Sequence, residues 1–219
     1  MPTSVLADRR PDVHEMVVIH RVFRRELTAL PVLIRRAHDS GRARVVAEHL
    51  HLILAGLHMH HTGEDAVLWP LLRERCVPSA ALIESMQRQH ERIDGFPGQI
   101  FLLADTWVSD ASVVRGEQLA RLVERLGESL FEHLDLEERE ILPLVSVHLS
   151  AAEWDSIGEH GKDAMTSRQL PLMFGAILEE ANPAEAGRML AHLPAPVRLL
   201  MRTVGLRQYR RYITRVRAA

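Results

Sequence analysis

The chain has 219 residues, 47% of them hydrophobic, which is enough for one large domain with a real core. Its single cysteine, Cys76, excludes an internal disulfide and fits a reducing compartment, while the 5% aromatic content disfavours nucleic-acid recognition by base stacking. No apolar run is long enough to direct secretion or span a bilayer, so we expect a soluble cytoplasmic protein without stable membrane insertion.

Helical periodicity dominates the first two-thirds of the chain, and strand patterns are nearly absent. Apolar residues at three- and four-residue steps predict helices over roughly 9–38, 42–74, 79–106 and 113–147. Pro31 and the glycine- and proline-containing segment 95–98 predict kinks in the first and third helices. Short linkers favour antiparallel neighbours, so the predicted fold class is all-α, with an up-down four-helix bundle over 1–149.

A histidine interrupts the apolar stripe of each predicted helix. The second helix carries His60 followed by Glu64, and the fourth carries His133 followed by Glu137. These motifs begin the similar stretches HHTGEDAVLWPLL and HLDLEEREILPLV, which start 73 residues apart. The first and third helices carry one such histidine each, His20 and His90. The chain therefore reads as two helical hairpins related by a pseudo-twofold axis.

Carboxylates and imidazoles inside a core need partners, and a pair of metal ions could satisfy all six together. Residues i and i+4 lie one above the other on a helix, so two carboxylates can bridge ions about 3.5–4 Å apart. Ligation by imidazole and carboxylate without thiolate suits iron or manganese, and zinc less distinctively. A salt bridge explains a single His-x-x-x-Glu more simply, but the doubled pattern favours a metal pair.

The complete order of these residues resembles the haemerythrin family, in its bacterial haemerythrin-like (HHE cation-binding) branch. That order is a lone His, His-x-x-x-Glu, a lone His and His-x-x-x-Glu, whereas ferritin-like di-iron bundles place the acid first, as Glu-x-x-His. The resemblance covers roughly 9–147. It implies a four-helix bundle around a non-haem centre of two Fe ions bridged by two carboxylates, with Mn or Zn as possible substitutes.

The sequence departs from the oxygen-carrying haemerythrins in two places. Where those proteins have a second histidine on the third helix, this chain has Met86 or Asp94. Their last motif also has Asp five residues after its histidine, whereas this chain has Glu137 at four and Glu138 at five. Glu137 stays on the apolar stripe and is the preferred ligand, with Glu138 a lesser candidate. His61 is the best replacement for the missing histidine, and a surface position for it stays open.

Other polar residues receive weaker assignments. Asp65 and Glu138, each following a motif glutamate, are candidates to accept hydrogen bonds from the ligands' N–H groups, or are simply solvated. Cys76 receives no role. The remaining histidines are assigned to the surface or to the surroundings of the ligands: His14, His38, His49, His51, His58, His148, His160 and His192.

Residues 150–219 read as a helical extension of the bundle. Ser150 with Glu153 forms a predicted capping box, and the run 182–185, Asn-Pro-Ala-Glu, marks a second helix start. Pro194 and Pro196 end that helix, and a basic helix is expected after residue 205.

The charge of the extension is unevenly placed. Eight arginines and no acid follow residue 185, so the tail carries +8 while 1–185 carries −10. The favoured interpretation is a helix docked on the bundle with its apolar face inward and its arginines against acidic helix surfaces. The alternative is a basic amphipathic arm that binds an anionic membrane or a partner.

The leading functional hypothesis is a di-iron protein that binds or reacts with O₂, NO or peroxide in oxidative or nitrosative stress. Oxygen storage is less favoured because the ligand set is altered. An oxidase or oxygenase with an organic substrate is an alternative, marked by a pocket larger than a diatomic molecule needs and lined by polar groups. A sensor acting through the tail is another. Both tyrosines, Tyr209 and Tyr212, lie in the tail, which disfavours a tyrosyl-radical generator.

Overall fold

The computed structural model describes residues 10–158 and 165–218, and every regular element in these ranges is a helix. The predicted all-α class is therefore confirmed. No helix among the described residues is both long enough and apolar enough to cross a membrane.

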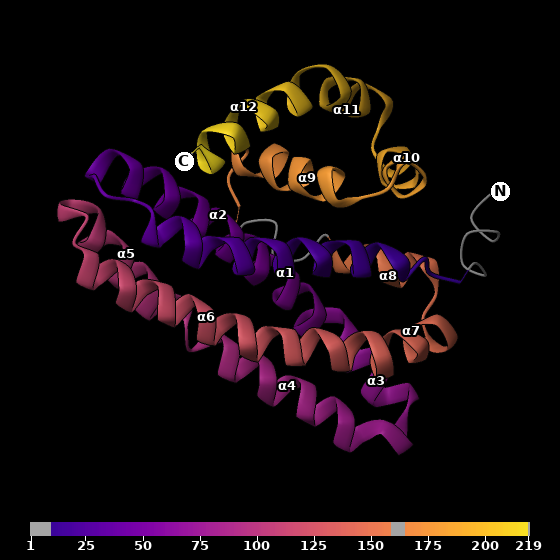
Figure 1. The fold of residues 1–219 in the computed structure, drawn as a ribbon. Helices are drawn as coiled ribbons and strands as arrows, with labels where there is room; N and C mark the ends of the chain where they lie inside the picture. The colour runs from indigo at the N-terminus through magenta and orange to yellow at the C-terminus, as the bar shows by residue number, and fades with distance from the viewer. Residues whose placement is uncertain (1–9, 159–164, 219) are drawn as a thin grey trace.

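Four helical rods form an up-down bundle (Figure 1). Two of them are continuous through a short π-helical turn and carry the His-x-x-x-Glu motifs. The first rod is α1 (His14–Arg35), and the third is split into α4 (Ala80–Asp94) and α5 (Pro97–Asp110). The second runs through α2 (Ser40–Gly63), η1 (Glu64–Leu68) and α3 (Trp69–Arg75), and the fourth through α6 (Val113–Leu136), η3 (Glu137–Ile141) and α7 (Leu142–His148).

Of the two predicted kinks, the one in the third helix coincides with a break in the rod. The third rod is interrupted between Asp94 and Pro97, where a proline begins α5. In contrast, α1 passes through Pro31 as a single helix. A short 3₁₀ turn, η2 (Val77–Ser79), connects the second rod to the third.

The bundle core consists of two apolar clusters with polar residues between them. The larger cluster includes Leu57 on α2 and Leu130 on α6. The smaller cluster includes Leu68 and Ile141, which lie further along the same two rods, after the motif glutamates. The motif histidines and glutamates lie between these positions in each rod, so they are surrounded by apolar side chains on both sides.

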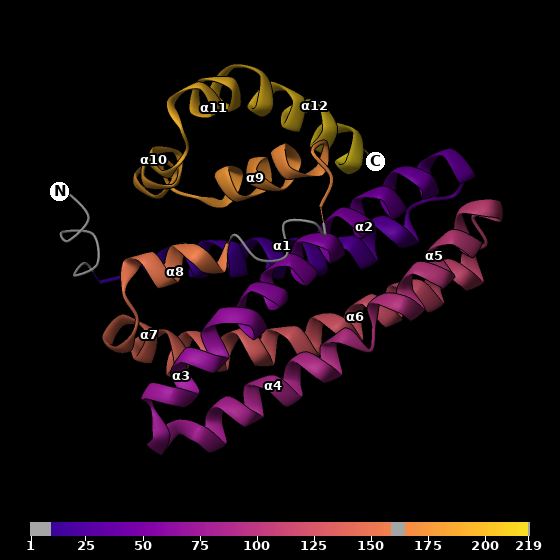
Figure 2. The same ribbon diagram turned by 180° about the vertical axis from the view of Figure 1, so that it is seen from behind.

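The rest of the chain forms a helical layer against one side of the bundle. Figures 1 and 2 show α9–α12 over α1 and α2, on the side away from α4. The helices of this layer are α8 (Ala151–Ile157), α9 (Gln169–Glu180), α10 (Pro183–His192), α11 (Ala195–Leu200), η5 (Met201–Gly205) and α12 (Leu206–Arg217).

Both helix starts predicted for the extension begin helices of this layer, and each has a capping box. Ser150 caps α8 together with Glu153, and Asn182 caps α10 together with Glu185. Helix α9 was not predicted from the sequence, although the residues just before it carry a signal. Thr166 and Gln169 exchange side-chain to backbone hydrogen bonds of 2.9 and 3.3 Å, which is the pattern of a capping box.

The last helix is docked on the bundle through its apolar face. Tyr209, Ile213 and Val216 of α12 are buried in one cluster with Val22 of α1 and Ala176 of α9. In the preceding turns Met201 is also buried, but three apolar residues are more than half exposed: Leu199, Leu200 and Val204. The inward apolar face predicted for the tail helix is thus found in α12, and Leu199, Leu200 and Val204 do not extend it.

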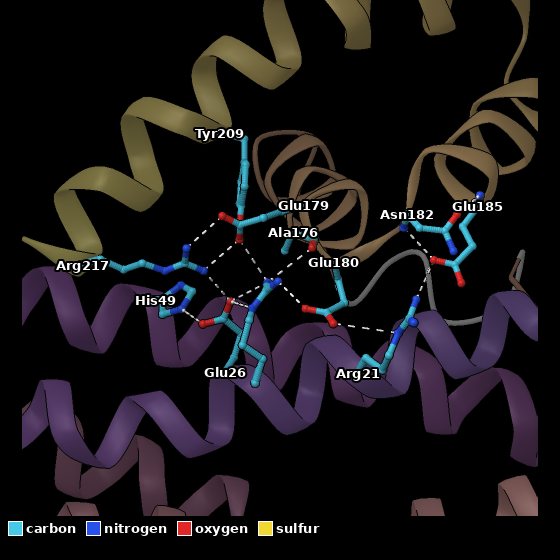
Figure 3. Close-up of polar contacts among 11 residues, drawn as sticks. Arg21, Glu26, His49, Ala176, Glu179, Glu180, Asn182, Glu185, Tyr209 and Arg217 are labelled. Carbon is cyan, nitrogen blue, oxygen red and sulfur yellow. Dashed lines mark hydrogen bonds and ion pairs between the residues drawn. The ribbon is translucent and has the colours of Figure 1, made fainter.

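A polar network holds α9 and α12 to α1 (Figure 3). Arg217 of α12 donates hydrogen bonds of 2.8 Å to Glu179 of α9 and one of 3.3 Å to Glu26 of α1. Arg25 of α1 donates to Glu26 at 2.7 Å and to Glu180 at 2.7 Å. The tail is therefore connected to acidic residues of α1 and α9 through Arg217, next to the buried apolar contact of α12.

His49 belongs to this network, which corrects its assignment to the surface or to the surroundings of the ligands. It is 1% exposed, and its two ring nitrogens lie 3.0 Å from the Glu26 carboxylate and 2.9 Å from the Tyr212 hydroxyl. Although burial opposes ionisation of Glu26, the hydrogen bond and charge of His49 and of Arg25 outweigh it and lower the pKa of Glu26 to about 2.

We expect Glu26→Gln to destabilise the protein at pH 7, by an amount that shrinks in acid. A carboxyl whose pKa falls from 4.5 to about 2 on folding contributes up to roughly 3 kcal/mol at neutral pH, and this is lost as the pH falls from about 4.5 to 2. Urea unfolding of parent and variant from pH 7 to pH 3 measures the difference. Glu48→Gln is the control, because Glu48 is 56% exposed and its pair with Arg215 spans 3.8 Å. A difference that does not change with pH would contradict the expectation.

Candidate metal centre

Each motif glutamate is the first residue of a five-residue π-helical turn. The backbone N–H of Trp69 donates to the Glu64 carbonyl, and that of Leu142 donates to the Glu137 carbonyl, five residues back in both cases. The next residue along is a proline in both rods, Pro70 and Pro143. Proline has no N–H and its ring clashes with the carbonyl four residues back, so a wider turn relieves the conflict without ending the rod.

The structure brings all seven predicted site residues together in the core. Their donor atoms form two groups, within each of which the atoms lie at most 4.8 Å apart. One group contains three imidazoles, and the other contains two imidazoles and both carboxylates. The groups are His61, His90 and His133, and His20, His60, Glu64 and Glu137.

The two carboxylates connect these groups. Glu64 lies 3.2 Å from Nε2 of His60 in its own group and 3.3 Å from Nε2 of His90 in the other. Glu137 lies 3.4 Å from Nε2 of His20 and 3.7 Å from Nε2 of His133. Each carboxylate thus faces the histidine of its own motif and the lone histidine of the other hairpin.

Many atoms of this cluster are buried without a hydrogen-bond partner. They include both carboxylate oxygens of Glu64 and of Glu137, both ring nitrogens of His61, and Nε2 of His20 and His60. Unpaired buried polar atoms are rare and costly, and a group of them converging on one place indicates a ligand for all of them. The residues present therefore fit a pair of metal cations, which would accept lone pairs from each.

The outer nitrogens of the two lone histidines are held by carboxylates. Nδ1 of His20 lies 2.8 Å from Glu138, and Nδ1 of His90 lies 2.8 Å from Asp65. These acids follow the motif glutamates, as the sequence suggested, but each orients the lone histidine of the opposite hairpin. Such acceptors fix the tautomer that directs Nε2 inward, toward the other donors. Glu138, the lesser ligand candidate, belongs to neither donor group.

Burial opposes protonation of the histidines of the cluster. It lowers the pKa of His60, His61 and His133 well below the usual range, which keeps these rings neutral with a free lone pair for a metal. Burial also opposes the charge of His90, but hydrogen bonds to Asp65 and Glu64 outweigh it and raise its pKa to about 9.

The pKa values of the two buried carboxylates are shifted in opposite directions. Burial and the nearby charge of Glu64 raise the pKa of Glu137 far above its usual range. Burial opposes ionisation of Glu64 as well, but His60 and His90 lower its pKa. Without further cations the pair therefore retains a proton at Glu137, which a metal would displace.

His61 faces the interior and not the surface. It is 1% exposed and stacks on His90 with ring centroids 4.0 Å apart. The two residues considered in place of a third-helix histidine are placed elsewhere: Met86 lies in the smaller apolar cluster, and Asp94 is exposed, 3.9 Å from His61. The position of His61 supports the prediction that it supplies the third imidazole of its group.

Sequence reasoning missed one residue of this cluster. Gln89 accepts from Nδ1 of His133 at 3.0 Å, the role that Asp65 and Glu138 have for the lone histidines. Of the other histidines, His14, His38, His58 and His192 are exposed as expected, His51 and His148 are half-buried, and His160 lies outside the described residues.

A family model described as the haemerythrin HHE cation binding domain matches residues 12–145. The chain belongs to the haemerythrin family. The match spans the four-helix bundle of this haemerythrin-like chain and leaves α8–α12 outside. For a haemerythrin HHE domain, cation binding is the expected property, and the buried histidine and glutamate groups could hold a metal ion. Comparison with curated proteins and with solved structures finds no match.

We expect loss of the outer acceptors to weaken metal binding without abolishing it. Asp65→Ala or Glu138→Ala should lower metal affinity about 10- to 100-fold, because His90 or His20 would no longer be held in the productive tautomer and orientation. Competition with a chelator measures this. Glu140→Ala, at an exposed acid of η3 that pairs with Arg139, is the matched control. Unchanged affinity in both acceptor variants would contradict the role.

Proposed function

We propose that this chain holds two iron ions bridged by Glu64 and Glu137, and that it binds or reacts with O₂, NO or peroxide in oxidative or nitrosative stress. The observation that carries the proposal is the position of each carboxylate within 3.7 Å of histidines from both donor groups. Seven nitrogen- and oxygen-donor residues exceed the four ligands of a zinc site, and no thiolate accompanies them. Manganese or zinc could replace iron in the same donor set.

The donor set is unequal, which bears on where a small molecule would bind. With both carboxylates shared, His61, His90 and His133 complete a five-donor set, whereas His20 and His60 complete a four-donor set. Two iron ions, when bound, would supply electrons and an exchangeable position to a small oxidant or to NO, and His20 and His60, in the group with fewer protein donors, would leave more room for such exchange. Asp65, Glu138 and Gln89 hold the imidazoles in place, and the apolar clusters on both sides exclude bulk water.

A di-iron oxidase or oxygenase with an organic substrate is the second candidate. A cavity of about 570 Å³ touches His60, and that volume exceeds the needs of a diatomic molecule, but its lining beside His60 is apolar and not polar as this candidate predicts. The tyrosines favour no radical role, because Tyr209 and Tyr212 lie on α12 in the outer layer.

Metal analysis with an optical spectrum, taken anaerobically and after exposure to air, tests the proposal. We expect two irons per chain, near-ultraviolet absorption in the oxidised protein that disappears on reduction, and a spectral change when the reduced protein meets NO or peroxide. The donor set of seven residues is the reason for two ions rather than one. One tightly held zinc per chain with no second site would contradict the proposal.

A further inference from the structure

The cavity that touches His60 lies between the bundle and the outer helical layer. Its described lining comes from α1 and α2 on the bundle side and from α8, α9 and the end of α10 on the other. The outer helices approach closely because two positions of α2 are glycine. A Cβ at Gly56 would lie 2.2 Å from the Cε of Met173, and one at Gly63 would lie 2.5 Å from the carbonyl of Ile157. The enclosure is thus built by the residues that follow the family domain.

The interior of the cavity is apolar where it meets the candidate metal centre. His60 and Phe23, whose ring centroids are 5.5 Å apart, both line it, together with Ile19, Met59 and Met173. Nε2 of His60 faces Glu64, on the side of the ring away from solvent. A molecule in the cavity would therefore contact His60 on the side of its ring away from Nε2, the atom that belongs to the four-residue donor group.

The charged residues of the described lining are acidic, apart from one histidine. They are Glu15, Asp155 and His192. Nδ1 of His192 lies 3.4 Å from Glu15, but the same Glu15 oxygen is buried without a hydrogen-bond partner, and burial raises the pKa of this carboxyl. Such a lining repels an anionic head group and offers an acceptor for one hydrogen-bond donor.

We propose that this cavity binds an uncharged, largely apolar organic molecule that carries a hydrogen-bond donor, and holds it against His60. Its volume of about 570 Å³ is within the range of pockets that enclose small organic ligands. This proposal adds to the proposed function that an organic molecule is bound beside the metal centre. The binding itself requires no metal.

Two fluorescent probes of the same skeleton test the charge and the polarity together. N-phenyl-1-naphthylamine is neutral and has one N–H donor, and 8-anilinonaphthalene-1-sulfonate adds an anionic group. Titrated into the purified full chain, the neutral probe should bind saturably at one site per chain, and the sulfonate at least tenfold more weakly. Glu15→Gln should narrow this difference by strengthening sulfonate binding, because one of the two lining carboxylates is removed.

Variants that fill the cavity locate the site. Ile19→Phe and Ile177→Phe, on opposite walls, should each weaken binding of the neutral probe at least tenfold. Val114→Phe is the matched control. Val114 is 69% exposed, and it lies on α6, which contributes no residue to the described lining. Melting curves on the same samples show that each variant is folded, and the two independent filling variants keep the test valid when one of them unfolds.

The outcomes separate this inference from the proposed function. Failure of the neutral probe to saturate, equal binding of both probes, or unchanged binding in both filling variants overturns the inference. Metal content measured on the same samples is the independent readout. Two irons per chain without probe binding overturn the cavity assignment alone, and probe binding to a chain that holds no iron pair overturns the metal proposal alone.

Discussion

Glu137→Ala is expected to lose most of the bound metal and to lower the melting temperature of the metal-loaded protein on the order of 10 °C. Glu137 faces histidines of both donor groups, so its loss removes a donor from each. A ligand present at 100 times its dissociation constant stabilises the folded state by about 2.7 kcal/mol, and a protein of this size shifts by about 2–4 °C per kcal/mol. Glu64→Ala, His60→Ala and His133→Ala should act similarly. His61→Ala should lose less, because the proposed five-donor set around it keeps the imidazoles of its group, His90 and His133, and the two shared carboxylates.

The isosteric change Glu137→Gln distinguishes a lost ligand from a damaged core. Burial and Glu64 raise the pKa of Glu137, so in the metal-free protein its ionisation opposes folding, increasingly as the pH rises above about 4.5. Metal-free Glu137→Gln should therefore melt at or above the metal-free parent at pH 7, while the metal-loaded parent melts well above both. Metal content by mass spectrometry and scanning calorimetry measure the two effects. A Glu137→Ala protein with full metal content and an unchanged melting temperature would exclude Glu137 as a bridge.

Removal of residues 194–219 is expected to lower the melting temperature and to speed the reaction of the metal centre with peroxide. The deletion exposes the cluster around Val22 and Ala176, which α12 covers with Tyr209, Ile213 and Val216. Fully burying such side chains contributes roughly 1.5–3 kcal/mol each, so a net loss of about 3 kcal/mol and a decrease of about 6–12 °C are reasonable. Reaction should accelerate because α9 would lose the helix that holds it over the cavity beside His60.

Point variants on α12 provide the matched comparison. Ile213→Asp places a charge in the buried cluster and should reproduce much of the destabilisation, whereas Thr214→Asp lies next to it on the exposed face and should have little effect. Melting curves and stopped-flow mixing with peroxide measure both. If truncation leaves stability and reactivity unchanged but abolishes binding to anionic lipid or to a partner, the tail acts as an interaction arm. That outcome would contradict the prediction that the docked tail stabilises the protein and shields the metal centre.

The bundle and the core positions of the six motif histidines and glutamates could be predicted because the evidence is local, whereas the sequence left the burial of His61 open. His60 with Glu64 and His133 with Glu137 lie four residues apart on stripes that are otherwise apolar, so helical periodicity alone places them in the core. The same reasoning could not find Gln89, because its contact with His133 depends on how α4 packs against α6. Nor could it place His49, whose partners Glu26 and Tyr212 lie 23 and 163 residues away in sequence.

The outer layer was less predictable because its helices are short and depend on tertiary contacts. Helix α9 contains Pro171 and Gly175, which weaken a helical signal, and only the Thr166–Gln169 pair marks its beginning. In α11 and η5 the apolar residues Leu199, Leu200 and Val204 recur at helical spacing before α12, but all three are exposed. Periodicity shows which residues share a face and does not show what covers that face.

The crossed pairing of the two hairpins is the pattern of an isologous dimer interface. His20 lies against Glu137 and Glu138 of the second hairpin, and His90 lies against Glu64 of the first, so each half completes the other. A hairpin with one lone histidine and one His-x-x-x-Glu motif could form this centre only as a homodimer with two identical ends. Carrying both copies in one chain allows the ends to diverge. The residue after the motif histidine is His61 in the first copy and Leu134 in the second, and this single difference gives one donor group an imidazole that the other lacks.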